Sequence, residues 1–276
     1  MTKVITLGLQ KGGVSKTTTT GILAYLLAQD GNEVLTVDMD SQGNLTELLT
    51  NQSANNFFDQ SIFEAIAYKK PEKYIYNITK QLDILPANNF LASFSRWLYK
   101  GKIPHTERTE VHAPYEGSHI NQLNLTLSPI KNKYDYILID TPPALSEQTS
   151  NALIASDYVI VLFEPSKFCY TAIPNFIETV EHAQSLVDLE VLGILRTLSD
   201  ARRKDTRFFN DLIVKDYADL VFDTMISRKA ATGRLPLSGF EDNDELNDAL
   251  KQYKAFYKEF LRRIKKGENY DQETNE

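Results

Sequence analysis

One stretch, Lys11-Gly12-Gly13-Val14-Ser15-Lys16-Thr17-Thr18, decides the fold of this 276-residue chain. It follows a short apolar run, Val4-Ile5-Thr6-Leu7, and precedes apolar residues at helical spacing from Ile22 to Leu27. The pattern predicts a strand, a glycine loop and the start of a helix. Backbone N–H groups of such a loop point at an anion, and the helix dipole favours negative charge there. Lys16 would reach the β- and γ-phosphates of a nucleotide, and the Thr17 hydroxyl would face Mg²⁺.

The stretch departs from the strict P-loop pattern, G-x-x-x-x-G-K-[ST], because Gln10 and Ser15 stand where that pattern has glycine. A serine at position 15 would cost about 1 kcal/mol or more if the backbone there needs a positive φ. At an ordinary helical φ the same serine would be harmless. The distinguishing feature is Lys11, which stands immediately before the double glycine.

A second motif is an apolar run, Val34-Leu35-Thr36-Val37, that ends in Asp38 and Asp40. On a strand, residues two apart point to the same face. In an open α/β sheet, ligands bind beyond the carboxyl ends of the strands. Both carboxylates are therefore expected in the crevice that holds the glycine loop.

A third motif, Tyr134-Asp135-Tyr136-Ile137-Leu138-Ile139-Asp140-Thr141-Pro142-Pro143, reads as a strand buried on both faces that ends in a carboxylate. Asp140 would then hold the hydration shell of Mg²⁺, an ion that is bound through one or two carboxylates plus substrate phosphates.

Together the three motifs resemble the ParA/MinD superfamily of P-loop ATPases. Their counterparts there are the deviant Walker A loop K-G-G-V-x-K-T-[ST], the element V-D-x-D-P-Q-G-N (Ser41 replaces its proline here) and the string Y-D-x-I-I-I-D-T-P-P. The resemblance implies that Lys11 crosses a dimer interface to the partner's nucleotide. It also implies that Asp40 positions the attacking water, that Asp38 belongs to the Mg²⁺ neighbourhood and that Pro142 stiffens a loop sensing the γ-phosphate.

These assignments define the expected site. The catalytic residues would be Lys11, Lys16 and Asp40, and the metal-binding residues Thr17, Asp38 and Asp140. Nucleotide contacts are expected from the loop (Gly12, Gly13, Val14, Ser15, Lys16, Thr17 and Thr18) and Pro142, with Thr197 and Ser227 expected near the adenine by resemblance.

Composition limits the classes of function. A hydrophobic content of 42% and a charged content of 24% are typical of soluble globular proteins. The single cysteine, Cys169, excludes an intramolecular disulfide and a multi-cysteine metal site, and so argues against a metal-trafficking or electron-transfer relative. No apolar stretch approaches the length of a membrane span, and no signal peptide precedes the first strand, so we expect a cytoplasmic protein.

Charge is unevenly distributed along the chain. The net charge of −7 argues against a basic attraction of the whole protein to nucleic acid. Between Arg196 and Arg234, however, nine Lys/Arg stand against six acids, a local charge of nine minus six, or +3. The resemblance places non-specific DNA contacts in this part of the chain, although a solvated charged face is the open alternative. The candidate DNA-binding residues are Arg202, Arg203, Lys204, Arg207, Arg228, Lys229 and Arg234.

Strand and helix patterns alternate, which predicts an α/β fold, a doubly wound, mostly parallel sheet flanked by helices. We expect one P-loop ATPase domain over residues 1–266, an insertion or mobile loop at 100–118 and a disordered acidic tail at 267–276. The expected strands lie near 3–8, 33–38, 82–86, 135–140, 158–163, 191–196 and 221–226. The expected helices lie near 16–29, 44–49, 61–68, 90–98, 119–131, 147–155, 172–187, 205–217 and 243–265.

The last helix carries a broad apolar stripe from Leu246 to Ile264. Such a stripe can dock on the sheet or a partner subunit, or lie on a membrane with Arg262, Arg263, Lys265 and Lys266 near lipid headgroups. Packing is favoured, because the stripe is rich in aromatic residues and the helix begins and ends in acidic segments. We therefore expect no membrane association.

The resemblance implies an ATPase, weak without its partners, that segregates plasmid, mobile-element or chromosomal DNA. Its cofactors would be ATP and Mg²⁺. Its partners would be a second copy of the chain in an ATP-dependent homodimer, non-specific DNA of the nucleoid, and a ParB-like or ribbon-helix-helix adaptor. The alternatives are a MinD-like positioning ATPase that uses the C-terminal helix, and a non-hydrolysing regulator if Ser15 distorts the loop.

Overall fold

The computed structural model describes the chain except residues 107–108, 201, 233–234, 236–239, 241–243 and 275–276. Its described part contains an eight-stranded sheet in the order β10-β9-β8-β1-β7-β2-β4-β3, in which only β3 and β4 pair antiparallel. A separate pair, β5 and β6, forms an antiparallel hairpin. The strands are β1 (Lys3–Gly8), β2 (Val34–Asp38), β3 (Tyr76–Asn77), β4 (Leu82–Leu85), β5 (Lys102–Thr106), β6 (Thr109–His112), β7 (Tyr136–Asp140), β8 (Tyr158–Phe163), β9 (Glu190–Ser199) and β10 (Val221–Ser227).

The central strands are buried on both faces because their apolar runs are continuous rather than alternating. Leu138 packs in a cluster with α1 and α10, whereas its neighbours Ile137 and Ile139 pack in a second cluster with α3 and α5. The strand period of two thus distributes one apolar run between two cores.

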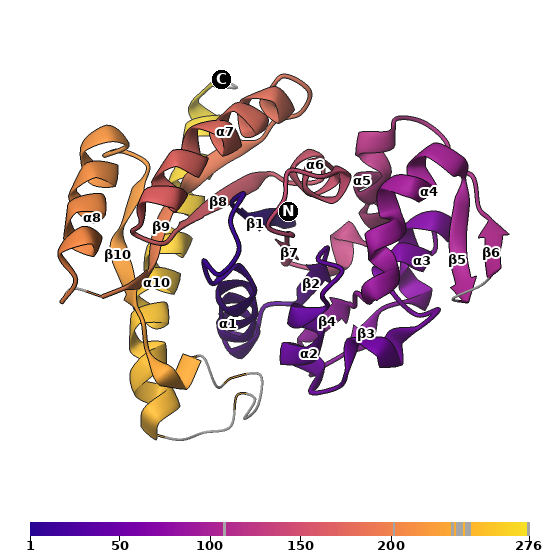
Figure 1. Ribbon diagram of the computed structural model, residues 1–276, viewed down its shortest axis with the longest axis horizontal. Coiled ribbons are helices and arrows are strands. Elements are labelled where there is room, and N and C mark those ends of the chain that lie inside the picture. Colours follow the sequence, from indigo (N-terminus) through magenta and orange to yellow (C-terminus); the bar gives the residue numbers. More distant parts are fainter. Residues whose placement is uncertain (107–108, 201, 233–234, 236–239, 241–243, 275–276) are drawn as a thin grey trace.

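Helices cover both faces of the sheet (Figure 1). In one layer α1 contacts both α2 and α10. In the other, contacts run from α3 through α5, α6 and α7 to α8, with α4 against α6. The helices are α1 (Lys16–Gln29), α2 (Asn44–Thr50), α3 (Ile62–Tyr68), α4 (Phe94–Lys100), α5 (Gln122–Leu127), α6 (Glu147–Ile154), α7 (Lys167–Gln184), α8 (Lys204–Asp216) and α10 (Asp244–Thr274), with short 3-10 helices η1 (Ala54–Phe57), η2 (Pro71–Lys73), η3 (Asn89–Ser93), η4 (His119–Asn121) and η5 (Lys131–Lys133).

The predicted doubly wound, mostly parallel sheet is confirmed, and every expected strand forms. Helix boundaries differ in several places, and the helix expected over 90–98 is divided into η3 and α4. The helix expected from residue 172 begins at Lys167, because Ser166 caps it by accepting a hydrogen bond from the Cys169 N–H. The helix expected over 119–131 is divided into η4, α5 and η5.

Two segments expected to lack regular structure, a mobile loop or insertion and the tail, contain regular secondary structure. The segment 100–118, expected as an insertion or mobile loop, contains the β5–β6 hairpin, which lies at the end of the molecule opposite α8 and β10 (Figure 1). Ile103 is buried there, and the Trp97 indole N–H donates to the Ala113 carbonyl at 2.6 Å. The tail expected to be disordered after Gly267 continues as helix α10 to Thr274.

The apolar stripe of α10 is packed against the sheet. Leu250, Phe256, Phe260 and Ile264 are all buried, and α10 contacts β10 and α1. The packing interpretation of the stripe is therefore confirmed, and this face is closed to lipid. In the described residues no helix is long and apolar enough to cross a bilayer.

Arg263 anchors the far end of α10 to the sheet. Its guanidinium donates to the carbonyls of Leu192 and Leu220 at 3.0 and 3.1 Å and to that of Val221 at 2.7 Å. The guanidinium also lies over the Phe222 ring, 4.0 Å from its centroid. Gly193 (φ +155°) makes room for it, since a Cβ there would lie 2.6 Å from Arg263 Nη1.

We expect Arg263→Ala to lower the free energy of unfolding by about 2–3 kcal/mol, because it removes three hydrogen bonds to strand carbonyls and the ion pair with buried Glu259. The matched control is Arg262→Ala, since Arg262 is exposed on the same turn, and its effect should stay within about 0.5 kcal/mol. Urea unfolding followed by circular dichroism measures both. Equal effects of the two substitutions would contradict an anchoring role for Arg263.

Candidate functional site

The glycine loop joins β1 to α1 and turns through two residues with left-handed backbone, Gly13 (φ 78°) and Ser15 (φ 65°). Of the two backbone conformations that the sequence left open for Ser15, the structure has the strained one. An L side chain in this region costs about 1–2 kcal/mol. Two side-chain hydrogen bonds fix the backbone of the loop and of the strand before it. The Thr197 hydroxyl donates to the Val14 carbonyl at 2.9 Å, and the Thr141 hydroxyl donates to the Leu7 carbonyl at 2.9 Å.

A cavity of about 400 Å³ lies over this loop. That volume is in the range of small-molecule sites. Because α1 begins at Lys16, the amides of the loop and the helix N-terminus make this cavity favourable for an anion. The cavity is lined by Gly12, Gly13, Val14, Ser15, Lys16, Thr17, Thr18, Asp40, Gln42, Asn44, Glu47, Leu48 and Pro143.

Lys16 is buried at the floor of the site, and its ammonium donates to the Lys11 carbonyl at 2.8 Å. Burial lowers the pKa of this lysine, and the nearby carboxylates of Asp140 and Asp40 oppose the shift. The loop thus surrounds the side chain of Lys16, which the sequence predicts to bind the phosphates.

Asp140 ends β7 and is fully buried beside Thr17. The Thr17 hydroxyl donates to Asp140 Oδ2 at 2.6 Å, while Oδ1 is buried and has no hydrogen-bond partner. Burial raises the pKa of Asp140 to about 8, with a further contribution from the charge of Asp38. A buried carboxylate oxygen without a donor, next to a hydroxyl, fits a hard cation such as Mg²⁺, which needs few protein ligands.

Among the described residues no three His, Cys, Asp or Glu side chains are grouped so that they could hold a metal ion. Mg²⁺ can be held by one or two carboxylates, with the other ligands coming from phosphates and water.

Asp38 was predicted near the metal, and the structure places it beside Asp140 in the β2–β7 register. Its oxygens are already used, however. Oδ1 accepts from the Asp40 N–H at 3.1 Å, and Oδ2 accepts from the Thr46 N–H at 2.9 Å and the Thr46 hydroxyl at 2.8 Å. Burial raises its pKa to about 7, which the Thr46 hydrogen bonds oppose. Asp38 thus shapes the turn that carries Asp40, and direct metal ligation is not supported by its contacts.

Asp40 lines the cavity, whereas Asp38, which the i, i+2 spacing placed in the same crevice, is fully buried and does not line it. Its Oδ1 accepts from the Gln42 N–H at 3.0 Å, which closes a tight turn. The sequence reasoning missed Gln42, Asn44, Glu47 and Leu48 as cavity residues, although Gln42 and Asn44 lie within the motif that identified Asp40.

Three predicted nucleotide contacts lie outside the cavity wall. Thr197 is fully buried beneath the loop that its hydroxyl supports, so it acts as a support rather than a surface for adenine. Ser227 ends β10, and its N–H donates to Gln252 Oε1 at 2.6 Å. Pro142 is half-buried, and it is its neighbour Pro143 that lines the cavity.

Lys11 leaves the loop on the solvent side. Its Nζ lies over the ring of Phe168, 5.4 Å from the centroid, and Phe168 is 72% exposed at the start of α7. This position is accessible to a second subunit, as the proposed dimer contact needs.

The basic residues at the end of β9 and around β10 are engaged in ion pairs with neighbouring acids. Arg202 pairs with Asp200 at 2.9 Å and Arg203 with Asp205 at 2.6 Å. Arg228 pairs with Glu164 at 3.2 Å, and Lys229 with Asp248. Lys204 and Arg207 are exposed on α8, whereas Arg234 lies outside the described residues.

A family model described as an AAA domain (AAA_31) matches residues 2–191 of the chain. The sporulation initiation inhibitor protein Soj of Bacillus subtilis is 33% identical over 243 residues, covering 87% of this chain and 89% of Soj. A putatively assigned plasmid partition protein of Borrelia burgdorferi bound to AMPPNP superposes with a TM-score of 0.74 at 26% identity, covering 97% of this chain and 100% of that one. A cobyrinic acid a,c-diamide synthase of Mycobacterium smegmatis with bound ADP and magnesium gives a TM-score of 0.78 at 28% identity, covering 97% of each chain.

We expect Ser15→Gly to raise the free energy of unfolding by about 1 kcal/mol, because glycine adopts φ 65° without steric strain. Thermal unfolding of the nucleotide-free protein measures the change. The control is Ser166→Gly, where φ is −151° and a helix cap is lost, so stability should fall by a few tenths of a kcal/mol. Loss of stability in Ser15→Gly would show that the serine side chain has a stabilising contact.

Proposed function

The chain belongs to the AAA domain family and is a ParA/Soj-type ATPase, and from this premise we propose that it is an ATP-driven DNA-segregation ATPase. One observation carries the proposal. Lys16, Thr17 and Asp40 line a single cavity at the carboxyl ends of β1, β2 and β7, and the Thr17 hydroxyl donates to Asp140. This is the edge at which an open α/β sheet binds its ligand.

ATP is the proposed substrate, with its phosphates over the glycine loop. Lys16 and the loop amides would bind the β- and γ-phosphates, and phosphate oxygens would replace the Lys11 carbonyl as the acceptor for the Lys16 ammonium. Asp140 and Thr17 would hold Mg²⁺, which supplies positive charge to the phosphates when it is bound. The neighbour structures with AMPPNP or with ADP and magnesium support this assignment.

Asp40 is proposed to orient the water that attacks the γ-phosphate. Its carboxylate lines the cavity, and the bond from the Gln42 N–H to Oδ1 holds it in place. Phosphoryl transfer depends on positioning and electrostatic stabilisation, so a fixed carboxylate and the two lysines provide what the step needs.

Lys11 is proposed to complete the site of a second subunit in an ATP-dependent homodimer. It is half-exposed, and its ammonium lies over the exposed ring of Phe168, a weak interaction to exchange. The γ-phosphate would then become part of the subunit interface.

Non-specific DNA is the proposed partner of the basic residues on α8 and after β10. Their ion pairs are exposed, and such pairs contribute about 0–1 kcal/mol and are screened by salt, so phosphates can replace the acids. Dimerisation doubles this surface, which would make DNA affinity depend on ATP through avidity.

A centromere-binding adaptor of the ParB-like or ribbon-helix-helix kind is proposed to stimulate hydrolysis, with the protein acting on the nucleoid in the cytoplasm. The membrane-positioning form of the MinD-like alternative is disfavoured, because the apolar stripe of α10 is buried against the sheet, whereas a protein-positioning ATPase stays the alternative.

The proposal is tested by electrophoretic mobility shift on non-specific duplex DNA without nucleotide, with ADP and with ATP across a salt series. We expect binding with ATP alone, with the slope of log affinity against log salt reduced by about 0.9 for each phosphate contact removed by Arg202→Glu with Arg203→Glu. The control pair, Lys254→Glu with Lys258→Glu, makes the same charge change on exposed positions of α10 and should bind normally. No binding in any nucleotide state would contradict DNA segregation.

We expect Lys11→Ala to bind ATP with little change but to remain monomeric, because the missing ammonium belongs to the partner's site. Light scattering measures the mass, and a fluorescent ATP analogue measures binding. Lys258→Ala on α10 serves as the control for loss of a lysine. A Lys11→Ala variant that dimerises normally with ATP would refute the shared site.

A further inference from the structure

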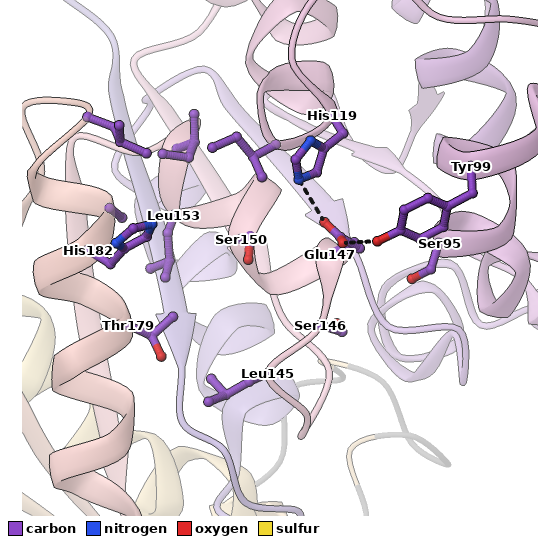
Figure 2. A pocket seen from close by; sticks show the side chains of 14 residues that line it. Ser95, Tyr99, His119, Leu145, Ser146, Glu147, Ser150, Leu153, Thr179 and His182 are labelled. Carbon is purple, nitrogen blue, oxygen red and sulfur yellow. Dashed lines mark hydrogen bonds and ion pairs between the residues drawn. The ribbon is translucent and has the colours of Figure 1, made fainter.

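Two cavities of the molecule differ in the charge that they accept. The cavity between α6 and α7, of about 550 Å³, contains the Glu147 carboxylate, to which Tyr99 donates at 3.2 Å and which lies 3.9 Å from His119 (Figure 2). No lysine or arginine is among the described residues that line it, so this cavity disfavours an anion. The glycine-loop cavity instead combines Lys16 with the N-terminal amides of α1, so phosphate groups are bound there.

Ser15 adds a side-chain hydroxyl to the amides of this loop. It lines the cavity and stands at the N-cap of α1, directly before Lys16. The strict P-loop pattern has glycine at this position. The hydroxyl is therefore an additional hydrogen-bonding group, which the glycine of that pattern would not supply.

This hydroxyl does not serve as a helix cap. A serine at an N-cap normally accepts a hydrogen bond from the second or third amide of its helix. Ser53, Ser61 and Ser166 do so, each from an extended backbone. Ser15 has a left-handed backbone (φ 65°, ψ 26°) and makes no side-chain cap bond.

The backbone strain at Ser15 is thus not offset by a capping bond. A left-handed serine costs free energy that a glycine would not. The Thr17 hydroxyl, in the same loop, already donates to Asp140 at 2.6 Å. Strain at a residue that lines a ligand cavity is grounds for inferring that the residue acts on the ligand.

We propose that the Ser15 hydroxyl is a phosphate ligand, and that it donates to the diphosphate group which ADP and ATP share. The inference rests on the proposed function. In that mechanism the γ-phosphate lies toward Asp40, which orients the water. The glycine loop and the start of α1 hold the phosphates behind it, and Ser15 is the residue at which the loop and the helix meet.

A donor to the shared diphosphate has a defined kinetic consequence. It binds substrate and product equally, so it strengthens nucleotide binding without accelerating the hydrolytic step. Differences in affinity between related complexes lie mainly in the dissociation rate. Ser15 therefore slows the release of ADP, and sets how long a subunit keeps its product after hydrolysis.

The test measures binding of ADP and of AMPPNP with Mg²⁺ by isothermal titration calorimetry. Ser15→Ala keeps the Cβ and the left-handed strain but lacks the hydroxyl, so both dissociation constants should rise about tenfold, as expected for one lost hydrogen bond to a charged group. Ser15→Gly removes hydroxyl and strain together, and should lose affinity by a similar factor. The control is Ser128→Ala, an exposed serine outside the cavity, which should bind both nucleotides like the parent chain.

Stopped-flow displacement of a fluorescent ADP analogue should show dissociation about tenfold faster from Ser15→Ala than from the parent chain. Unchanged dissociation constants in Ser15→Ala would overturn the proposal. Parental affinity in Ser15→Gly would also overturn it, because the effect would then come from strain. A loss confined to AMPPNP would place the hydroxyl on the γ-phosphate and would refute its assignment to the shared diphosphate.

The mobility-shift assay of the proposed function gives a separate answer. A parent chain that binds nucleotide but not DNA would contradict DNA segregation and leave the role of Ser15 supported by the calorimetry. A parent chain that binds DNA with ATP, together with a Ser15→Ala variant of parental affinity for both nucleotides, would contradict the role of Ser15 alone.

Discussion

Burial of Asp140 next to Thr17 and Lys16 is the constraint on which the rest of the site depends. A carboxylate with one unsatisfied oxygen in the sheet interior is costly, which is why burial raises its pKa to about 8. Lys16 offsets part of that cost, but its own burial lowers its pKa. The attraction between the two groups therefore does not offset the full cost of burying both charges. A cation and a polyphosphate would supply the missing partners. The same groups that make this cavity unfavourable when empty thus make it selective for a metal-bound nucleotide.

The neighbouring backbone is built to hold this arrangement. Strained Ser15 persists because the fold determines the loop from several sides: Thr197 supports Val14 from β9, and Thr141 ties the end of β7 to Leu7 in β1. Asp38 performs a similar task on β2, since its carboxylate bonds to Thr46 and to the Asp40 N–H. Residues that resemble ligands by position therefore act as supports for the residues that face the cavity.

The loop between β7 and α6 connects two regions of the molecule. Residues 141–147 follow Asp140, pass Pro143 near Gly12 and end at the start of α6. Because parallel strands place their carboxyl ends at one edge of the sheet, a loop that leaves this edge can contact both the nucleotide and a partner on the helical layer. The β7–α6 connection thus links the nucleotide cavity to the helical layer.

The sequence by itself determined which strands carry the functional side chains. Lys16, Asp40 and Asp140 each follow an apolar run, and this pattern suffices to place them at one edge of the sheet. It also determined that α10 packs, since its broad aromatic stripe is too apolar to leave exposed. Only the tertiary structure decided that Thr197 lies under the loop, that Ser15 is left-handed and that Pro143 rather than Pro142 meets the cavity. It alone brought Tyr99, His119 and Glu147 together. These outcomes depend on contacts between segments distant in the chain, and local periodicity carries no information about which side chain a distant backbone will approach.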